Sequence, residues 1–246
     1  MCRKLLVALD FDHTVIDSNS DVEVQRLARG GEIPTEVRKL YSTHCWTNFM
    51  QKVFETLHCQ GISVDQYKQC LQSQKFVPGM KELLVDVGQK NNIQMIIISD
   101  SNSLFIDYIL KFHSINETVS EVFSNPAYFD ASGCLRIRYY HLQNDCPYSS
   151  MNLCKGQVLT EYLNSKRDDG LVFDSVIYVG DGMHDLCPAL RLRASDHVFV
   201  RKGYGLEKLI SAPDRTFSLT ASVHIWKTGL EILSFIRSLS DLKETV

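Results

Sequence analysis

Two aspartates, Asp10 and Asp12, follow the first apolar run of the chain, which covers residues 5–9. A short apolar run of this kind predicts a strand buried on both faces, with the aspartates at its carboxyl end. Residues i and i+2 of an extended chain point the same way, so both carboxylates face one side. At about 4 Å and an effective dielectric constant of about 20 they repel by about 4 kcal/mol, a cost that a hard divalent cation offsets. Taken alone, the pair is equally compatible with a strand-end cap followed by a turn residue.

Two further apolar runs end in polar residues of the same character. These residues are Ser99 and Asp100, which follow the run 93–98, and Asp181 and Asp185, which follow the run 175–179. A helix predicted between the two runs carries Lys155. Because the carboxyl ends of parallel strands lie along one edge of a sheet, we expect all these side chains to converge on one site.

The chemistry expected at this edge is phosphoryl transfer, which needs positive charge, hydrogen-bond donors and an in-line nucleophile. We expect Asp10 to attack phosphorus and form an aspartyl-phosphate. We expect Asp12 to protonate the leaving oxygen and later to activate the water that attacks this intermediate. Asp10, Asp181 and Asp12 (through its backbone carbonyl) are the expected Mg²⁺ ligands, while Ser99 and Lys155 bind the remaining phosphate oxygens. Neither a G-x-x-x-x-G-K-[ST] motif nor a G-x-G-x-x-G motif occurs in the sequence.

Strand-like and helical segments alternate along the chain, which predicts an α/β fold with a doubly wound parallel sheet. A fourth strand is predicted at 196–200, and 134–140 alternates weakly and indicates a short β-segment. The tail over 221–239 is predicted to be an amphipathic helix that packs on the sheet.

Residues 18–74 have a mixed-polar, helical pattern without a convincing strand. Pro34 marks a helix start, apolar residues then recur at helical spacing as far as Leu57, and Ser63 opens a further short helix. We therefore predict a helical cap at 18–74, inserted into a core domain formed by 1–17 and 75–246.

Composition limits the class of protein. The net charge of −3 shows no global attraction to nucleic acid, and 44% hydrophobic with 22% charged residues is typical of a globular chain with a sizeable core. No apolar run approaches the length of about 18 residues that a membrane span needs. The amino terminus does not resemble a signal peptide. The expected partner is a small phosphorylated metabolite, with no nucleic acid and no membrane, and the sequence indicates no protein partner.

Eight cysteines are scattered through the chain without a C-x-x-C pair, which predicts reduced thiols in the cytoplasm. They are Cys2, Cys45, Cys59, Cys70, Cys134, Cys146, Cys154 and Cys187. A zinc site formed by His141, Cys146 and Cys154 remains an alternative, although its spacing lacks the paired cysteines of typical zinc motifs.

These motifs resemble the pattern of haloacid-dehalogenase superfamily phosphatases, which is D-x-D-x-T, a strand-end Ser or Thr, a Lys, and G-D-x-x-x-D. The matching residues are Asp10-Phe11-Asp12-His13-Thr14, Ser99, Lys155 and Gly180-Asp181-Gly182-Met183-His184-Asp185. Within the superfamily, the chain resembles the vertebrate phosphoethanolamine/phosphocholine phosphatase family, in particular its pyridoxal phosphate phosphatases. The segments that carry this likeness are 17–21, 98–103, 152–155 and 201–204.

The resemblance implies a Rossmann-like core with a helical cap after the first motif, Mg²⁺ as cofactor, and binding of a cationic headgroup by Asp21 and Asp100. The implied function is Mg²⁺-dependent hydrolysis of a small phosphomonoester, with pyridoxal 5′-phosphate as the leading substrate and phosphoethanolamine or phosphocholine as the alternative. An alternative of another class is a catalytically silent, metabolite-binding scaffold with the same fold.

The sequence departs from the family pattern at two places. His13 stands where Glu or Asn is usual, and Met183-His184 replaces Gly-Asn or Ala-Asn. A histidine there can donate to phosphate or support a metal ligand, or it can be a tolerated loop substitution. The aromatic residues of the predicted cap, Tyr41, Trp46 and Phe49, fit either the core of the cap or a cover over the substrate.

Overall fold

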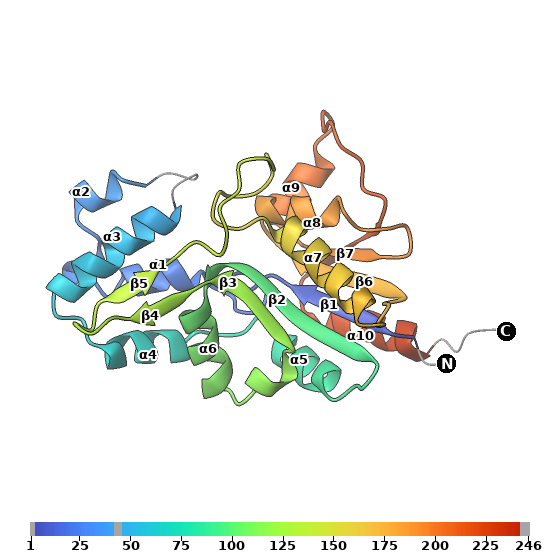
Figure 1. The fold of residues 1–246 in the computed structure, drawn as a ribbon, viewed down its shortest axis with the longest axis horizontal. Coiled ribbons are helices and arrows are strands. Elements are labelled where there is room, and N and C mark those ends of the chain that lie inside the picture. Colours follow the sequence, from blue (N-terminus) through green and yellow to red (C-terminus); the bar gives the residue numbers. More distant parts are fainter. Residues whose placement is uncertain (1–2, 42–45, 242–246) are drawn as a thin grey trace.

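A six-stranded parallel sheet forms the centre of the molecule, in the order β3-β2-β1-β6-β7-β8 (Figure 1). The structure is a computed structural model that describes residues 3–41 and 46–241. The strands of the sheet are β1 (Leu5–Leu9), β2 (Ile93–Asn102), β3 (Glu121–Asn125), β6 (Ser175–Gly180), β7 (His197–Arg201) and β8 (Ser222–Trp226). The α/β fold with a doubly wound parallel sheet, expected from the sequence, is confirmed.

Strand β1 lies at the point where the winding of the sheet changes direction. It pairs in parallel with β2 on one side and with β6 on the other. Strands β2 and β3 lie on one side of β1, and β6, β7 and β8, which come later in the sequence, lie on the other. Crevices at the carboxyl ends of strands at such a switch point are the usual ligand sites of open α/β sheets.

Helices cover both faces of the sheet, because alternate residues of β1 pack into two separate cores. Leu5, Val7 and Leu9 join one core, and Leu6 and Ala8 join the other. The first core includes α5 (Met80–Gly88), α6 (Ser103–Phe112) and α10 (Gly229–Asp241), and the second includes α7 (Lys155–Asp168), α8 (Leu186–Ala189) and α9 (Gly205–Ser211).

The segment between β1 and β2 is helical, as expected, and most of it extends beyond one end of the sheet (Figure 1). Before α5 it contains α1 (Ser20–Gln25), the 3₁₀ helix η1 (Arg29–Gly31), α2 (Thr35–Arg38), α3 (Trp46–Cys59) and α4 (Val64–Gln72). Ser63 caps α4 reciprocally with Gln66, which satisfies backbone donors at the helix start. The expected domain boundaries at 18–74 remain a prediction.

A small antiparallel pair, β4 (Ala127–Phe129) and β5 (Leu135–Ile137), packs beside α3 (Figure 1). The Ile137 N–H donates to Oε1 of Gln51 at 3.0 Å, and Arg136 forms an ion pair with Glu55. The sequence indicated the β-segment but not its contact with the inserted helices. The remaining short elements are the 3₁₀ helices η2 (Asn116–Thr118) and η3 (Met183–Asp185).

The prediction of a single helix over 221–239 is wrong, because the tail first forms the edge strand β8 and then α10. The residues of β8 pair with β7 in a parallel register that sets Val198 opposite Val223 and Arg201 opposite Trp226. Val223, Ile225 and Trp226 favour a strand, but five residues are too few to distinguish a strand from a helix by pattern. No helix within the described ranges is long and apolar enough to cross a membrane.

Alanine substitutions in β8 test this assignment. Trp226 is fully buried and neighbouring Ile225 is 47% exposed, as alternation along a strand requires. Trp226→Ala is expected to lower the free energy of unfolding by about 3–5 kcal/mol, whereas Ile225→Ala costs less than about 1 kcal/mol. Urea unfolding measures both, and equal losses would contradict the strand.

Candidate active site

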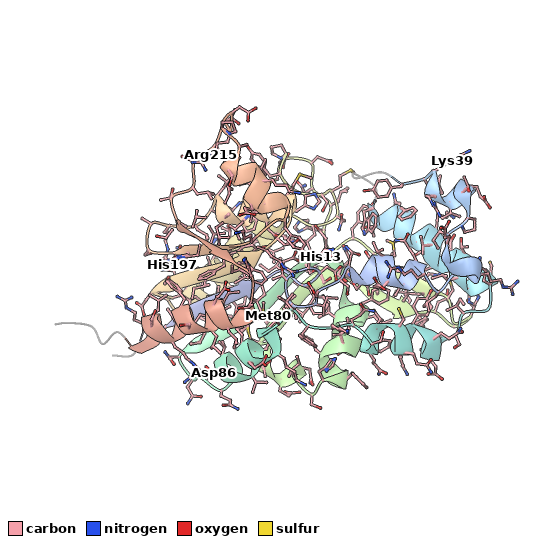
Figure 2. All side chains as sticks on the ribbon, turned by 180° about the vertical axis from the view of Figure 1, so that it is seen from behind. His13, Lys39, Met80, Asp86, His197 and Arg215 are labelled. Carbon is pink, nitrogen blue, oxygen red and sulfur yellow. The ribbon has the colours of Figure 1, made fainter. Side chains whose placement is uncertain are left out.

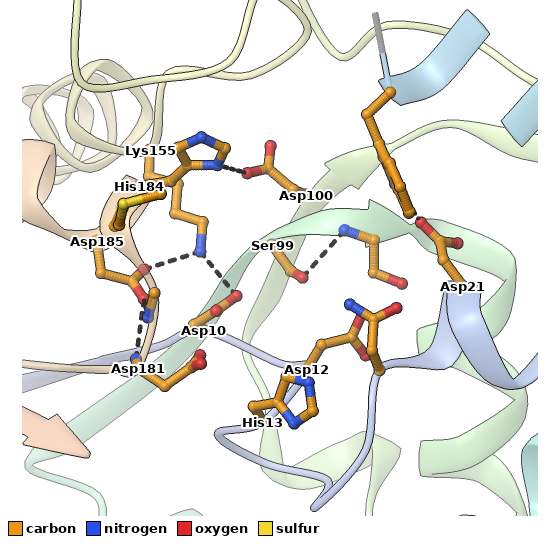
Figure 3. Close-up of a pocket in the computed structure, with 15 residues that line it drawn as sticks. Asp10, Asp12, His13, Asp21, Ser99, Asp100, Lys155, Asp181, His184 and Asp185 are labelled. Atoms are coloured by element: carbon orange, nitrogen blue, oxygen red, sulfur yellow. Dashed lines mark hydrogen bonds and ion pairs between the residues drawn. The ribbon is translucent and has the colours of Figure 1, made fainter. Parts of the chain in front are cut away.

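The seven residues that the sequence singles out line one cavity of about 220 Å³ (Figure 3). They are Asp10, Asp12, Asp21, Ser99, Asp100, Lys155 and Asp181. We call this space the aspartate cavity. It opens at the carboxyl edge of the sheet, next to the ends of β1, β2 and β6. The structure therefore brings the strand-end residues together, as expected, whereas their chemical roles stay predictions.

Lys155, the first residue of α7, is buried between two carboxylates. Its Nζ lies 2.8 Å from Oδ1 of Asp10 and 2.8 Å from Oδ1 of Asp185 (Figure 3). Burial lowers the pKa of Lys155, but the charges of Asp10 and Asp185 outweigh this effect and raise the pKa above its usual range. The ammonium group is therefore charged at neutral pH.

Asp185, whose role the sequence left unassigned, holds this arrangement from behind. Its Oδ1 also accepts from the Tyr178 hydroxyl at 2.7 Å, and its Oδ2 accepts the N–H groups of Asp181 and Gly182 at 3.0 and 2.9 Å. A Cβ at Gly180 would lie 2.4 Å from the Asp185 carboxyl carbon, so only glycine fits there. The second aspartate of the G-D-x-x-x-D motif was the available signal for this residue.

Three carboxylates lie close enough together to hold a divalent cation. One oxygen each of Asp10, Asp181 and Asp185 lies within 4.8 Å of the others. Burial raises the pKa of Asp10 to about 6, although the charge of Lys155 lowers it. Burial, together with the charges of Asp10 and Asp185, raises the pKa of Asp181 to about 9. Because both Asp185 oxygens already accept hydrogen bonds, Asp10 and Asp181 are the better ligands. Buried, mutually repelling carboxylates of this kind fit a hard cation such as Mg²⁺.

Asp12 is held by the start of α1. Its two carboxylate oxygens accept from the Ser20 N–H at 3.0 Å and the Ser20 hydroxyl at 3.1 Å. The Ser20 hydroxyl also contacts the Ser101 hydroxyl at 2.8 Å. Burial, followed by the charge of Asp21, raises the pKa of Asp12 well above its usual range. A carboxyl group in this environment is protonated more readily, as a general acid requires.

Asp100 is paired with His184, one of the two departures from the family pattern. His184 Nδ1 lies 2.9 Å from Asp100 Oδ2, while Asp100 Oδ1 accepts from the Ser150 hydroxyl at 2.9 Å. Burial pushes the pKa of Asp100 up, but His184 outweighs it and lowers the pKa; the same hydrogen bond raises the pKa of His184. The pair is thus ionic from the lowered pKa of Asp100 up to the raised pKa of His184.

Asp21 binds the cap residue Trp46. Its Oδ2 accepts from the Trp46 indole N–H at 2.7 Å, and its buried Oδ1 has no hydrogen-bond partner among the described residues. Burial raises the pKa of Asp21 to about 7. The ring of Trp46 lies 5.4 Å from that of Phe49 and also lines the aspartate cavity, so it takes part in both the cap core and the site.

His13 occupies the turn that carries the chain from β1 towards α1, between the sheet and the inserted helices (Figure 2). Its φ of 55° lies in the left-handed region, which histidine adopts more readily than most residues. Arg201, at the end of β7, donates to the His13 carbonyl and forms an ion pair with Asp17. The role of Arg201 was not predicted, although its position at the end of an apolar strand was a signal.

The parallel sheet and the aspartate–lysine cluster at its switch point define a phosphatase of the haloacid-dehalogenase type. The chain belongs to the family described as Putative Phosphatase, whose sequence model matches residues 5–239. The expected family and the expected enzyme class, a phosphoric monoester hydrolase, are thereby confirmed.

Curated relatives and solved structures agree with this assignment. The chain is 38% identical over 240 residues to human pyridoxal phosphate phosphatase PHOSPHO2, covering 96% of this chain and 98% of the relative. It is 33% identical over 232 residues to human phosphoethanolamine/phosphocholine phosphatase, covering 93% and 86%. A substrate-bound phosphoserine phosphatase structure has a TM-score of 0.63 at 14% identity, covering 96% of this chain and 99% of that one, which shows a shared fold.

Substitution of Lys155 tests the buried cluster. Lys155→Met leaves Asp10 and Asp185 without their cation and is expected to lower the free energy of unfolding by about 3–5 kcal/mol. Lys166→Met on the same helix removes a partly exposed ion pair with Glu121 and should cost less than about 1 kcal/mol. Urea unfolding at neutral pH in chelator measures both, and similar small losses would show that Lys155 does not hold the cluster together.

Proposed function

We propose that the protein is a Mg²⁺-dependent phosphomonoesterase that hydrolyses pyridoxal 5′-phosphate through an aspartyl-phosphate on Asp10. The observation that carries this proposal is the buried Asp10 carboxylate, which lies 2.8 Å from Lys155 and beside Asp181 in a cavity of about 220 Å³. This volume is below the range of roughly 300–1,000 Å³ typical of drug-sized ligands, which favours a small phosphate ester.

Asp10, Asp181 and the backbone carbonyl of Asp12 would hold the metal ion. When bound, Mg²⁺ supplies positive charge that offsets the phosphate dianion and the surrounding carboxylates. Lys155 and Ser99 would bind the other phosphate oxygens, Lys155 as a fixed charge at the start of α7.

The chain's own residues account for each proton in the reaction. An Asp10 oxygen forms a bond to phosphorus as the ester P–O bond breaks, and protonated Asp12 gives its proton to the leaving oxygen. Asp12, now a carboxylate, takes a proton from the water that attacks the aspartyl-phosphate, which releases phosphate and restores Asp10. The raised pKa of Asp12 supports its first role.

The surroundings of Asp100 favour pyridoxal phosphate over amino-alcohol esters. His184 and Ser150 engage both Asp100 oxygens, so a quaternary ammonium ion finds this carboxylate already paired. Asp21 is likewise engaged by Trp46 through one oxygen. The human, bovine and mouse relatives named pyridoxal phosphate phosphatase support the same choice. Phosphoethanolamine and phosphocholine remain the alternative substrates because Asp21 and Asp100 are both acidic.

We place this activity in the cytoplasm. Six cysteines of the described part carry no disulfide, which fits a reducing compartment. Cys2 and Cys45 lie outside the described residues. Fractionation of cells that express the tagged chain tests this location.

Replacement of the nucleophile tests the reaction. Asp10→Asn is expected to lower kcat by at least about 1,000-fold because the amide cannot form the phospho-aspartate. Chelation of metal should abolish activity in the wild type, and added Mg²⁺ should restore it. Acid quenching during turnover followed by peptide mass spectrometry should find phosphate on Asp10.

Activity that survives Asp10→Asn would rule out the covalent mechanism. Asp107→Asn, which alters a partly exposed carboxylate paired with Lys111 on α6, is the matched control and should retain activity. Wild-type protein that hydrolyses none of the three candidate esters with Mg²⁺ would instead favour the silent scaffold.

Substrate preference tests the role of the Asp100–His184 pair through kcat/KM for the three esters. The wild type should prefer pyridoxal phosphate. His184→Asn removes the cationic partner of Asp100 Oδ2 and should raise the relative kcat/KM of phosphoethanolamine and phosphocholine by about 2–5-fold, as expected for a partly exposed charge. Asp100→Asn should lower the relative kcat/KM of these two esters by a similar factor. Unchanged ratios in both variants would contradict a headgroup role for Asp100.

A further inference from the structure

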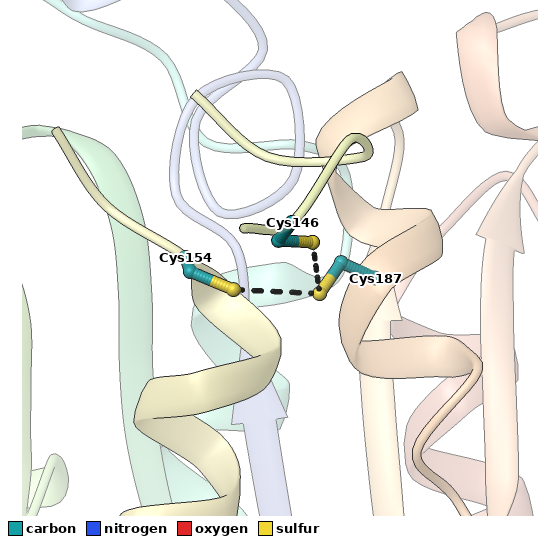
Figure 4. Close-up of side chains that lie close together, drawn as sticks. All are labelled: Cys146, Cys154 and Cys187. Carbon is teal, nitrogen blue, oxygen red and sulfur yellow. Dashed lines mark hydrogen bonds between the residues drawn. The ribbon is translucent and has the colours of Figure 1, made fainter. Parts of the chain in front are cut away.

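Three cysteine sulfurs meet at a second place in the fold (Figure 4). Cys187 Sγ lies 3.3 Å from Cys146 Sγ and 3.5 Å from Cys154 Sγ, and all three sulfurs lie within 4.8 Å of one another. They come from different segments: the loop before α7, the residue that precedes α7, and α8. The fold thus brings Cys187, which is distant in the sequence, to the two soft ligands Cys146 and Cys154.

The cluster borders a separate cavity of about 510 Å³. The described residues that line it, among them Gln143, Tyr148 and Arg191, are distinct from those of the aspartate cavity. Cys154 and Cys187 are buried, while Cys146 is partly exposed on the loop. A ligand bound by the sulfurs would therefore have an open side.

We propose that Cys146, Cys154 and Cys187 form a binding site for a thiophilic divalent cation of the zinc class, with its fourth coordination position facing this cavity. Thiolates are strong ligands of zinc and poor ligands of Mg²⁺, so the site is chemically separate from the aspartate cavity. Zinc binding displaces the thiol protons into the buffer.

The surroundings of the sulfurs suit an anionic thiolate site. Three thiolates around a doubly charged cation carry one net negative charge. Arg191 Nη2 lies 3.9 Å from Cys154 Sγ, and the sulfur stands at the positive end of the fourteen-residue helix α7. The Ser149 hydroxyl donates to Cys154 Sγ at 3.4 Å. The hydrogen bond between the Cys187 thiol and Cys154 lowers the pKa of Cys154, and the same contact raises the pKa of Cys187.

The ligand set differs from the zinc alternative considered from the sequence. His141 Nε2 accepts the Cys154 backbone N–H at 2.8 Å, so its lone pair is already engaged. His141 instead fixes the backbone that presents Cys154, as supporting groups around metal ligands commonly do. Cys187 takes the third place, and its separation in sequence from Cys146 and Cys154 explains why spacing did not indicate it.

The proposed cation would connect the segments that hold the buried ion pair. Cys154 directly precedes Lys155, and Cys187 follows Asp185 by two positions. Lys155 and Asp185 already connect the start of α7 to the segment before α8 through a contact of 2.8 Å. A metal ion bound by Cys154 and Cys187 would be a second connection between the same two segments.

Cobalt titration of the full chain tests the proposal. The protein, reduced and freed of metals, is titrated with Co²⁺ under argon in excess Mg²⁺, which is added to compete with Co²⁺ for the aspartate cavity. We expect one equivalent to produce the sulfur-to-cobalt charge-transfer absorption that carboxylate ligands do not give, and Zn²⁺ to displace it. Cys187→Ser and, on the exposed loop, Cys146→Ser should each weaken Zn²⁺ binding by more than about 100-fold, beyond the loss typical of a supporting residue.

Cys134→Ser is the matched control, since Cys134 is also buried but lies outside the cluster, and its Zn²⁺ affinity should equal that of the wild type. Three results would overturn the proposal: no charge-transfer absorption, the same absorption in both cluster variants, or a disulfide between two of these cysteines in freshly isolated protein with no Zn²⁺ uptake after reduction.

Discussion

The site depends on one buried ion pair network, in which Lys155 lies between Asp10 and Asp185. Removing three charged groups from water is costly, and the cost is recovered only if each charge finds close partners. The structure meets this condition with the Tyr178 hydroxyl and two backbone N–H groups on Asp185. Because these groups come from the ends of β1 and β6 and the start of α7, the network fixes the relative positions of three elements.

The switch point of the sheet explains why these groups meet. Asp10 follows β1 and Asp181 follows β6, and the two strands are direct neighbours although the sequence separates them widely. Ser99 belongs to β2, the neighbour of β1 on the other side. Parallel pairing thus places three strand ends that are distant in the sequence next to one another around one cavity. Lys155, the first residue of α7, reaches the same cavity from one face of the sheet.

Much of this arrangement could be predicted because apolar strands and their polar ends are local features of the sequence. Contacts between distant side chains are not local, so no pattern in the sequence indicated that Trp46 binds Asp21 or that His184 pairs with Asp100. The prediction for the tail was wrong for a different reason: Val223, Ile225 and Trp226 alternate with polar residues over too short a segment to distinguish a strand from a helix. Pairing with β7 decided the outcome, and that depends on the whole sheet.

Gly180 shows that an essential position need not carry a functional group. The space where its side chain would stand is filled by the Asp185 carboxyl group. One added methyl group would displace that carboxylate, and with it the contact to Lys155, although alanine carries no polar group of its own. Inherited variation at this codon would therefore act as an active-site lesion, and a survey limited to polar or charged residues would overlook it.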